Sequence, residues 1–115
     1  MTHNREAFLN AYIEAALWST GDGDLESLEA FEIAEETKAE MAKDCLNFLE
    51  DNKALLDGLD VKQCGHDFWL TRNGHGCGFY DGDYPEPKAT LLTEASDKFG
   101  ECSLYLGDDD LVYII

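Results

Sequence analysis

The chain has 115 residues, of which 44% are hydrophobic, and its 25 acidic against 8 basic side chains give a net charge of −17 and a pI near 4.1. This charge argues against direct binding to nucleic acid or anionic membranes and favours basic protein surfaces as partners, and no apolar run approaches the roughly 20 residues of a membrane span. The length suits a single compact domain over residues 1–115, with a helical, acidic half (1–60) and a second half (61–115).

Two helices are predicted in the acidic half. Residues 4–18 repeat apolar side chains at the i, i+3, i+4 spacing of an amphipathic helix, and the run Gly21–Asp24 ends it. A second helical pattern runs from about Ser27 to Leu56, with its first turns the least regular. Asn52 interrupts the apolar stripe of this helix, so we expect it to hydrogen-bond to another element if it is buried.

Residues 65–81 predict a β-hairpin. Asn73-Gly74 is a pair favoured in type I′ turns, whose central residues need positive φ, and aromatic residues flank it on both sides. Because strand side chains alternate between faces, Phe68 should pack on the helices and Trp69 should lie on the outer face.

The remaining chain predicts a loop, a helix and two strands. Two prolines exclude a helix or a central strand from residues 82–87. A short helix is expected over Thr90–Phe99, followed by strands at 102–106 and 111–115 around a turn at 107–110. The predicted fold class is therefore α+β, with two N-terminal helices packed on an antiparallel sheet of ββαββ order.

The first residues and the cysteines indicate a cytoplasmic protein. Residues 1–6 carry no apolar signal core or cleavage site. The cysteines are spread over predicted helices and strands rather than spaced as a disulfide framework, so we expect reduced thiols. They are Cys45, Cys64, Cys77 and Cys102.

Four stretches of the chain form a recognisable pattern. They are Ala11–Ser19, Asp44-Cys45 with Phe48, the motif HDFWLTRNGHG at His66–Gly76, and Phe99–Glu101 with Gly107–Asp109. The pattern resembles a family of small, functionally uncharacterised bacteriophage proteins and covers most of the chain. The resemblance implies a phage protein acting in the host bacterial cytoplasm, and it implies no mechanism.

Two patterns raise the question of a metal. Cys64, His66, His75 and Cys77 are the ligand types of a tetrahedral zinc site, but the hairpin would place the two histidines about 20 Å apart at about 3.3 Å per residue. The Asp- and Gly-rich turns lack the twelve-residue loop of a calcium site and its terminal glutamate. We therefore expect neither a metal nor another cofactor.

A candidate site lies in the predicted hairpin at His66, Asp67, Arg72 and His75. The His66-Asp67 pair could orient an imidazole for acid–base work, with Cys64 nearby as a nucleophile. No second acid, oxyanion-binding pair or phosphate-binding turn accompanies it, so we predict no catalytic residue. A small enzyme or ligand-binding domain centred on this hairpin is the alternative function.

An acidic stripe is the most informative feature for function. On a helical wheel its members, Glu29, Glu32, Glu36, Glu40, Asp44 and Asp51, fall within about a third of a turn. Like charges at this spacing each cost a few tenths of a kcal/mol, so the stripe is either a solvated helix face or a binding surface. The residues predicted to bind a partner are Asp22, Asp24, Glu29, Glu32, Glu36, Glu40 and Asp44.

The leading hypothesis is a non-enzymatic, phage-encoded inhibitor. Its carboxylates would mimic the charge of nucleic acid and occupy the basic groove of a host nucleic-acid-binding protein, with counterion release and a few aromatic anchors supplying affinity. A third possibility is a phage assembly or interaction protein that binds through the outer aromatic face of Trp69.

Overall fold

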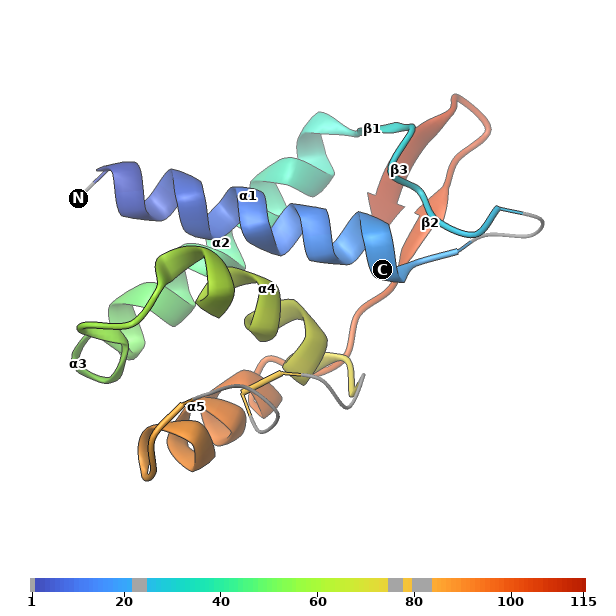
Figure 1. Cartoon of the computed structure of the whole chain (residues 1–115). Coiled ribbons are helices and arrows are strands. Elements are labelled where there is room, and N and C mark those ends of the chain that lie inside the picture. Colours follow the sequence, from blue (N-terminus) through green and yellow to red (C-terminus); the bar gives the residue numbers. More distant parts are fainter. Residues whose placement is uncertain (1, 22–24, 75–77, 80–83) are drawn as a thin grey trace.

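The computed structural model describes residues 2–21, 25–74, 78–79 and 84–115, without the side chains of 2–4. Five helices and a small sheet make up this part of the chain (Figure 1). In chain order they are α1 (Thr2–Ser19), β1 (Glu32–Ile33), α2 (Glu35–Asp51), α3 (Lys53–Leu56), α4 (Val61–Arg72), α5 (Lys88–Asp97), β2 (Leu104–Leu106) and β3 (Leu111–Ile114). The α+β class is confirmed, and the predicted order of elements is wrong.

Helix α1 forms where the apolar spacing predicts it. Phe8, Tyr12 and Ala15 are fully buried and recur at the i, i+4, i+7 spacing of one helix face. This face packs against α2 and more extensively against α4, which runs beside α1 in Figure 1.

The second predicted helix is interrupted at both ends. Residues 32–33 form a strand, and Ala34 N–H extends its pairing by donating to Val112 O at 3.0 Å. Helix α2 then starts with Glu35 and Glu36 in its first turn, where carboxylates interact favourably with the helix dipole. Asn52 ends α2, and its amide donates back to Phe48 O at 2.9 Å. Asn52 is only partly buried, so the bond to another element that was expected of a buried Asn52 is not required.

Helix α4 replaces the first strand of the predicted hairpin, and residues 75–77 and 80–81 of its second strand lie outside the described residues. Asp60 caps the N-terminus of α4 by accepting hydrogen bonds from Lys62 N–H at 2.9 Å and Gln63 N–H at 3.1 Å. Gly74 follows the helix with a φ of 66°, and its N–H donates to Thr71 O at 3.2 Å. The Asn73-Gly74 pair thus ends a helix through the left-handed glycine typical of C-caps, rather than turning a hairpin.

Trp69 is buried rather than lying on an outer face. It is 1% exposed, and its indole N–H donates to Ser19 Oγ at 2.9 Å. Its neighbours Phe68 and Leu70 are also buried, because α4 packs against both α1 and α5. Three consecutive buried positions are expected of a helix covered on more than one side.

The sheet is mixed and three-stranded, in the order β1-β3-β2. Strands β2 and β3 pair antiparallel around the predicted turn, with Tyr105 opposite Tyr113, so the two C-terminal strands are confirmed. Strand β1 comes from the acidic half and pairs parallel with β3. An antiparallel sheet of ββαββ order is therefore wrong: the described residues of the segment 61–115 form α4, α5, β2 and β3.

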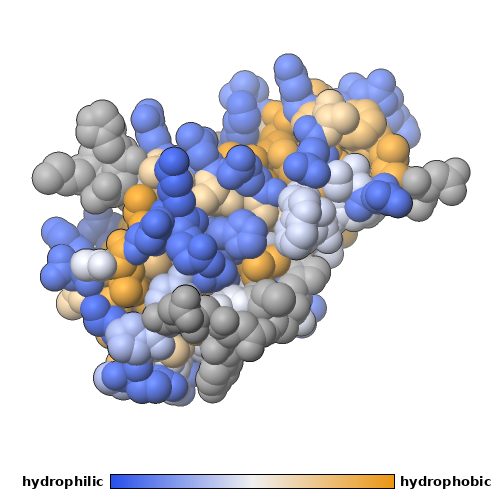
Figure 2. Space-filling model, viewed as in Figure 1, coloured by the Kyte–Doolittle hydropathy of each residue, from blue (hydrophilic) through white to orange (hydrophobic). Residues whose placement is uncertain are grey.

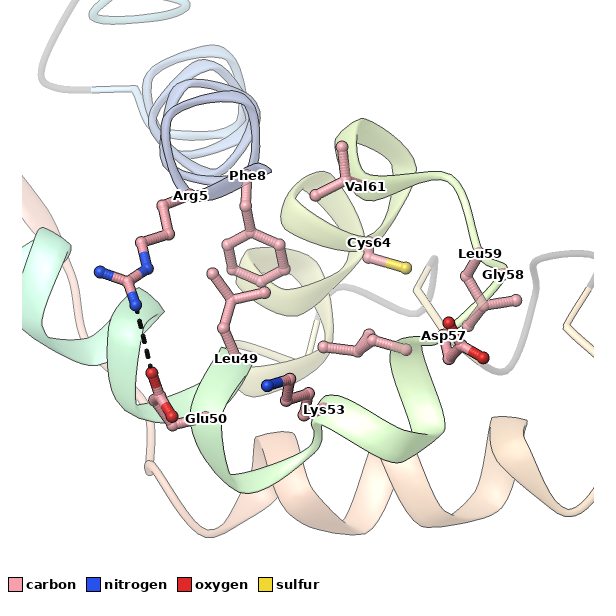
Figure 3. Close-up of a pocket in the computed structure, with 11 residues that line it drawn as sticks. Arg5, Phe8, Leu49, Glu50, Lys53, Asp57, Gly58, Leu59, Val61 and Cys64 are labelled. Atoms are coloured by element: carbon pink, nitrogen blue, oxygen red, sulfur yellow. Dashed lines mark hydrogen bonds and ion pairs between the residues drawn. The ribbon is translucent and has the colours of Figure 1, made fainter. Parts of the chain in front are cut away.

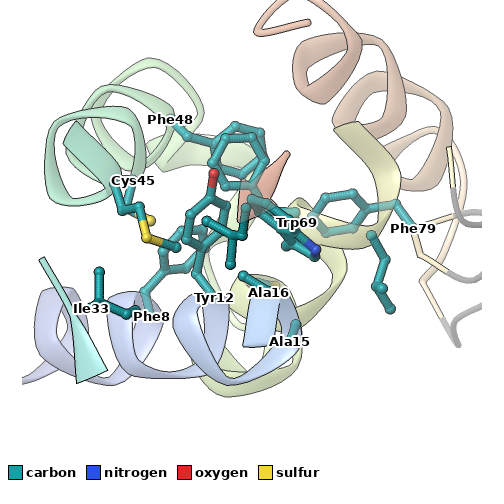
Figure 4. Close-up of a cluster of buried hydrophobic side chains, with 14 of the residues drawn as sticks. Phe8, Tyr12, Ala15, Ala16, Ile33, Cys45, Phe48, Trp69 and Phe79 are labelled. Atoms are coloured by element: carbon teal, nitrogen blue, oxygen red, sulfur yellow. The ribbon is translucent and has the colours of Figure 1, made fainter. Parts of the chain in front are cut away.

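The core joins both halves of the chain. Figure 4 shows side chains of α1, α2 and α4 meeting in one cluster. The rings of Phe48 and Phe68 stack with centroids 4.1 Å apart, and Tyr12 meets Trp69 edge-on at 5.4 Å. Because each pair connects two helices, residues 1–60 and 61–115 share this core.

Gly65 allows the closest approach of α4 to α1. A Cβ built on Gly65 would overlap the carbonyl oxygen of Phe8 and lie 3.2 Å from the Ala11 Cβ. We expect Gly65→Ala to lower the free energy of unfolding by about 1–3 kcal/mol in urea denaturation, although alanine favours an isolated helix by up to about 1 kcal/mol. Lys62→Ala, at an exposed position of α4, is the control. A more stable Gly65→Ala variant would contradict the close packing of these helices.

Candidate functional site

The predicted acidic stripe does not lie on one helix. Glu29 lies in the turn before β1, Glu32 lies in β1, and the other members, Glu36, Glu40, Asp44 and Asp51, lie on α2. The first four are exposed, whereas Asp44 is partly buried. Asp22 and Asp24 lie outside the described residues. The helical wheel that united these residues therefore applies only from Glu35 onward.

The sheet adds carboxylates that the helical pattern could not include. Glu32 pairs with Leu111, which directly follows the exposed run Asp108–Asp110. Glu36 lies close enough to Tyr113 for its charge to help raise the pKa of that phenol. We call these five residues, Glu32, Glu36, Asp108, Asp109 and Asp110, the acidic edge. The parallel pairing of β1 with β3 creates it.

Tyr113 and Asp109 are linked within the acidic edge. The Tyr113 hydroxyl donates to Asp109 Oδ2 at 2.5 Å. This bond raises the pKa of Tyr113 to about 12 and lowers the pKa of Asp109. Asp109 therefore stays ionised to lower pH than an ordinary aspartate, which keeps negative charge at the edge.

Asp44 serves the fold by neutralising a buried arginine. Arg72 Nη1 lies 2.9 Å from Asp44 Oδ2, and the two side chains are 5% and 23% exposed. The same nitrogen donates to the Tyr12 hydroxyl at 2.9 Å. The other guanidinium nitrogens donate to Gly100 O at 2.9 Å and to Phe99 O at 3.0 Å. Arg72 thus connects α1, α2, α4 and the segment after α5.

A second polar network surrounds Asp67. This carboxylate is 3% exposed and accepts hydrogen bonds from the Tyr84 hydroxyl at 2.6 Å and the Gln63 amide at 3.0 Å. Desolvation, followed by the hydrogen bond to Asp67, raises the pKa of Tyr84. The network holds the segment at Tyr84 against α4.

The thiol of Cys64 is poorly suited to nucleophilic chemistry. Cys64 is 1% exposed, and burial raises the pKa of its thiol from 9.0 to about 11. Cysteine nucleophiles react as thiolates and need a lowered pKa. Cys64 is therefore a neutral core residue at physiological pH, and Cys45 and Cys102 are likewise free thiols.

The candidate hairpin site is only partly assembled. His66 Nδ1 lies 3.7 Å from Asp67 Oδ1, beyond hydrogen-bond distance, and its ring packs 6.0 Å from that of Trp18. Arg72 is occupied by its structural contacts and lies at the end of helix α4 rather than in a hairpin strand. His75 lies outside the described residues. Only His66 and Asp67 remain adjacent.

Neither a metal-binding cluster nor a membrane helix is found where the structure describes the chain. No three side chains of His, Cys, Asp or Glu gather there in a way that could hold an ion. Two of the four residues considered as zinc ligands, His75 and Cys77, lie outside the described residues. Within the same residues, no helix has both the length and the apolar character needed to cross a membrane.

The Arg72–Asp44 pair generates a stability prediction. Asp44→Ala removes the counter-ion of a buried guanidinium, so we expect a loss of about 3–5 kcal/mol in the free energy of unfolding. Glu40→Ala, one turn earlier on α2 and exposed, should change it by less than about 0.5 kcal/mol. Urea denaturation of both variants measures the difference, and equal effects would mean that the ion pair is dispensable.

The raised pKa of Cys64 generates a pH prediction. The unfolded thiol ionises near 9.0 and the folded thiol near 11, so the unfolded state releases its proton first as pH rises. The contribution of Cys64 is complete below pH 9 and is lost as pH rises towards about 11. Urea unfolding across this range should show a shallower loss of stability in Cys64→Ala than in wild type. An unchanged slope would show that the folded thiol ionises normally.

No family model, curated protein or solved structure matches the chain. What the protein does must therefore be inferred from its own charges and contacts.

Proposed function

We propose that the protein is a non-enzymatic binding protein that presents its carboxylates to the basic, nucleic-acid-binding groove of another protein. The phage setting implied by the sequence resemblance makes a host enzyme the expected partner and inhibition the expected effect. The acidic edge, flanked by Glu29 and Glu40, is the proposed contact surface.

One observation carries the proposal: the carboxylates of the acidic edge are exposed and have no cationic partner among the residues that the structure describes. Among the described residues, the ion pairs are Arg5–Glu50, Arg72–Asp44 and His66–Asp67, and none includes the acidic edge. The edge therefore keeps its full negative charge facing solvent. A basic partner would relieve this repulsion and release the counterions that cover it.

Two tyrosines provide aromatic contact area beside these carboxylates. The rings of Tyr105 and Tyr113 stack at 5.7 Å across β2 and β3, and Tyr105 is 41% exposed. Tyrosine faces attract the guanidinium groups that line nucleic-acid-binding grooves. On the face seen in Figure 2, hydrophilic residues likewise surround smaller hydrophobic areas.

The alternatives have less support. An enzyme or ligand-binding domain at the predicted hairpin needs a free Arg72, but the Arg72 guanidinium is bonded within the core. The nearby thiol of Cys64 is neutral. An assembly protein binding through Trp69 needs an exposed ring, and Trp69 is buried. Assembly through another surface would appear as a different class of captured partner.

The test removes negative charges from exposed positions that do not hold the fold together. Glu32→Gln, Glu36→Gln and Glu40→Gln are combined in one variant, and Asp44 is left intact because it neutralises Arg72. Partner binding should weaken about tenfold or more, and the slope of log K against log salt should flatten. Folding stability should stay equal or rise slightly, since a like-charge i,i+4 contact between Glu36 and Glu40 is removed.

The matched control removes three charges elsewhere. Glu94→Gln, Asp97→Asn and Glu101→Gln lie on or after α5, are exposed, and change the net charge equally. The partner is first captured from bacterial lysate at low salt and eluted by a salt gradient, and DNA or RNA should compete with the protein for it. If both variants lose affinity equally, or if nucleic acid does not compete, charge mimicry by the acidic edge is wrong.

A further inference from the structure

A pocket of about 310 Å³ lies on the opposite part of the fold from the sheet, at the junction of the helices (Figure 3). Its walls come from the start of α1, the end of α2, α3, the turn at 57–59 and the start of α4. None of the pocket residues belongs to the acidic edge or to the His66–Asp67 pair. It is therefore a separate site.

Apolar atoms make up a little more than half of the accessible lining of the pocket, and polar atoms make up the rest. Phe8 and Cys64 lie beneath this lining and are fully or almost fully buried. Leu49, Leu56 and Val61 are partly buried and form part of the lining, and Figure 3 shows the Leu49 side chain next to the ring of Phe8. The apolar part of this lining favours an apolar ligand body, because burying it removes hydrocarbon surface from water.

The mouth of the pocket carries an unusual charge balance for this protein. Arg5 and Lys53 line it together with Glu50 and Asp57, and the Lys88 ammonium donates to the backbone oxygen of Asp57 at 3.1 Å. Three cations thus meet two anions here, whereas the whole chain has 8 basic against 25 acidic residues.

Of these three cations, only Arg5 has an anionic partner among the described residues, Glu50 at 3.4 Å. The Lys88 ammonium is held by the backbone oxygen of Asp57. Lys53 is exposed and takes part in none of the ion pairs found in the described residues. An ammonium at the rim of a partly apolar pocket is complementary to an anionic group attached to an apolar chain.

We propose that this pocket binds a small amphipathic carboxylate, with its hydrocarbon chain against Leu49, Leu56 and Val61 and its anionic head at Lys53. The volume lies at the low end of the range for ligand pockets, about 300–1,000 Å³, which suits one short chain and excludes a two-chain lipid. The expected ligand class is a medium-chain fatty acid or a similar apolar acid.

The test compares three probes with the same chain and different heads: decanoate, decanol and decylammonium, each below its micellar concentration. In ¹H–¹⁵N NMR titrations of the full chain, decanoate should shift the amides of Leu49, Lys53, Val61 and Cys64 saturably. It should bind more tightly than decylammonium, although the protein's net charge of −17 favours the cation. Tighter binding of decylammonium, shifts confined to other residues, or no saturable binding would overturn the proposal.

Two variants test the charged mouth in opposite directions. Lys53→Gln should weaken decanoate binding about fivefold and leave decanol unchanged. Glu50→Gln removes an anion and frees Arg5, so it should tighten decanoate binding. Lys43→Gln, at an exposed position on α2 outside the pocket, is the matched control. If Lys53→Gln and Lys43→Gln weaken binding equally, Lys53 does not bind the head group and the proposed site is wrong.

Discussion

The buried guanidinium of Arg72 is the interaction on which the arrangement of the elements depends. A charge removed from water is tolerated only when it is paired and hydrogen-bonded. Tyr12, Asp44 and the carbonyls of Phe99 and Gly100 meet this need, and they come from three segments: α1, α2 and the chain after α5. Because losing any one of them leaves Arg72 less satisfied, the guanidinium constrains where α1, α2 and the chain after α5 can lie relative to α4. The rings of Phe68 and Phe99 also lie within 5.8 and 5.6 Å of it, adding cation–π contact.

The elements with a regular spacing of apolar residues could be predicted from the sequence, whereas helix α4, which lacks such a spacing, could not. Helix α1 has one buried face and the C-terminal strands flank a turn, so local spacing is sufficient for both. Helix α4 is buried on several sides, which removes the 3.6-residue pattern, and Gly65 argues locally against a helix. Gly65 is needed for tertiary packing, because a side chain there would overlap the backbone of Phe8. The pair Asn73-Gly74 did indicate a positive φ at Gly74, but this conformation is shared by hairpin turns and helix C-caps.

The candidate surface was partly predictable for a related reason. Helical periodicity places Glu36 and Glu40 together, and the structure keeps them exposed. It cannot bring in Asp108–Asp110, because these residues join Glu32 only through the parallel pairing of β1 with β3, across about 80 positions of sequence. Helical periodicity also cannot distinguish a carboxylate that binds a partner from one that stabilises the fold. Asp44 continues the helical series of Glu36 and Glu40, and its role changes because a single buried arginine lies beside it.

The few basic side chains of this chain are unevenly distributed, so they neutralise the negative charge in some parts of the molecule and not in others. Arg72 is consumed in the core, while Arg5, Lys53 and Lys88 gather around the pocket at the helix junction. The sheet end receives none of the ion pairs that the described residues form. A net charge of −17 is therefore not spread evenly over the molecule. Glu36 of the acidic edge and Glu50 of the helix junction lie at opposite ends of α2, about 21 Å apart at 1.5 Å per residue. Exposed charges more than about 10 Å apart are largely screened at physiological salt, so we expect the charges at the helix junction to have little effect on the acidic edge.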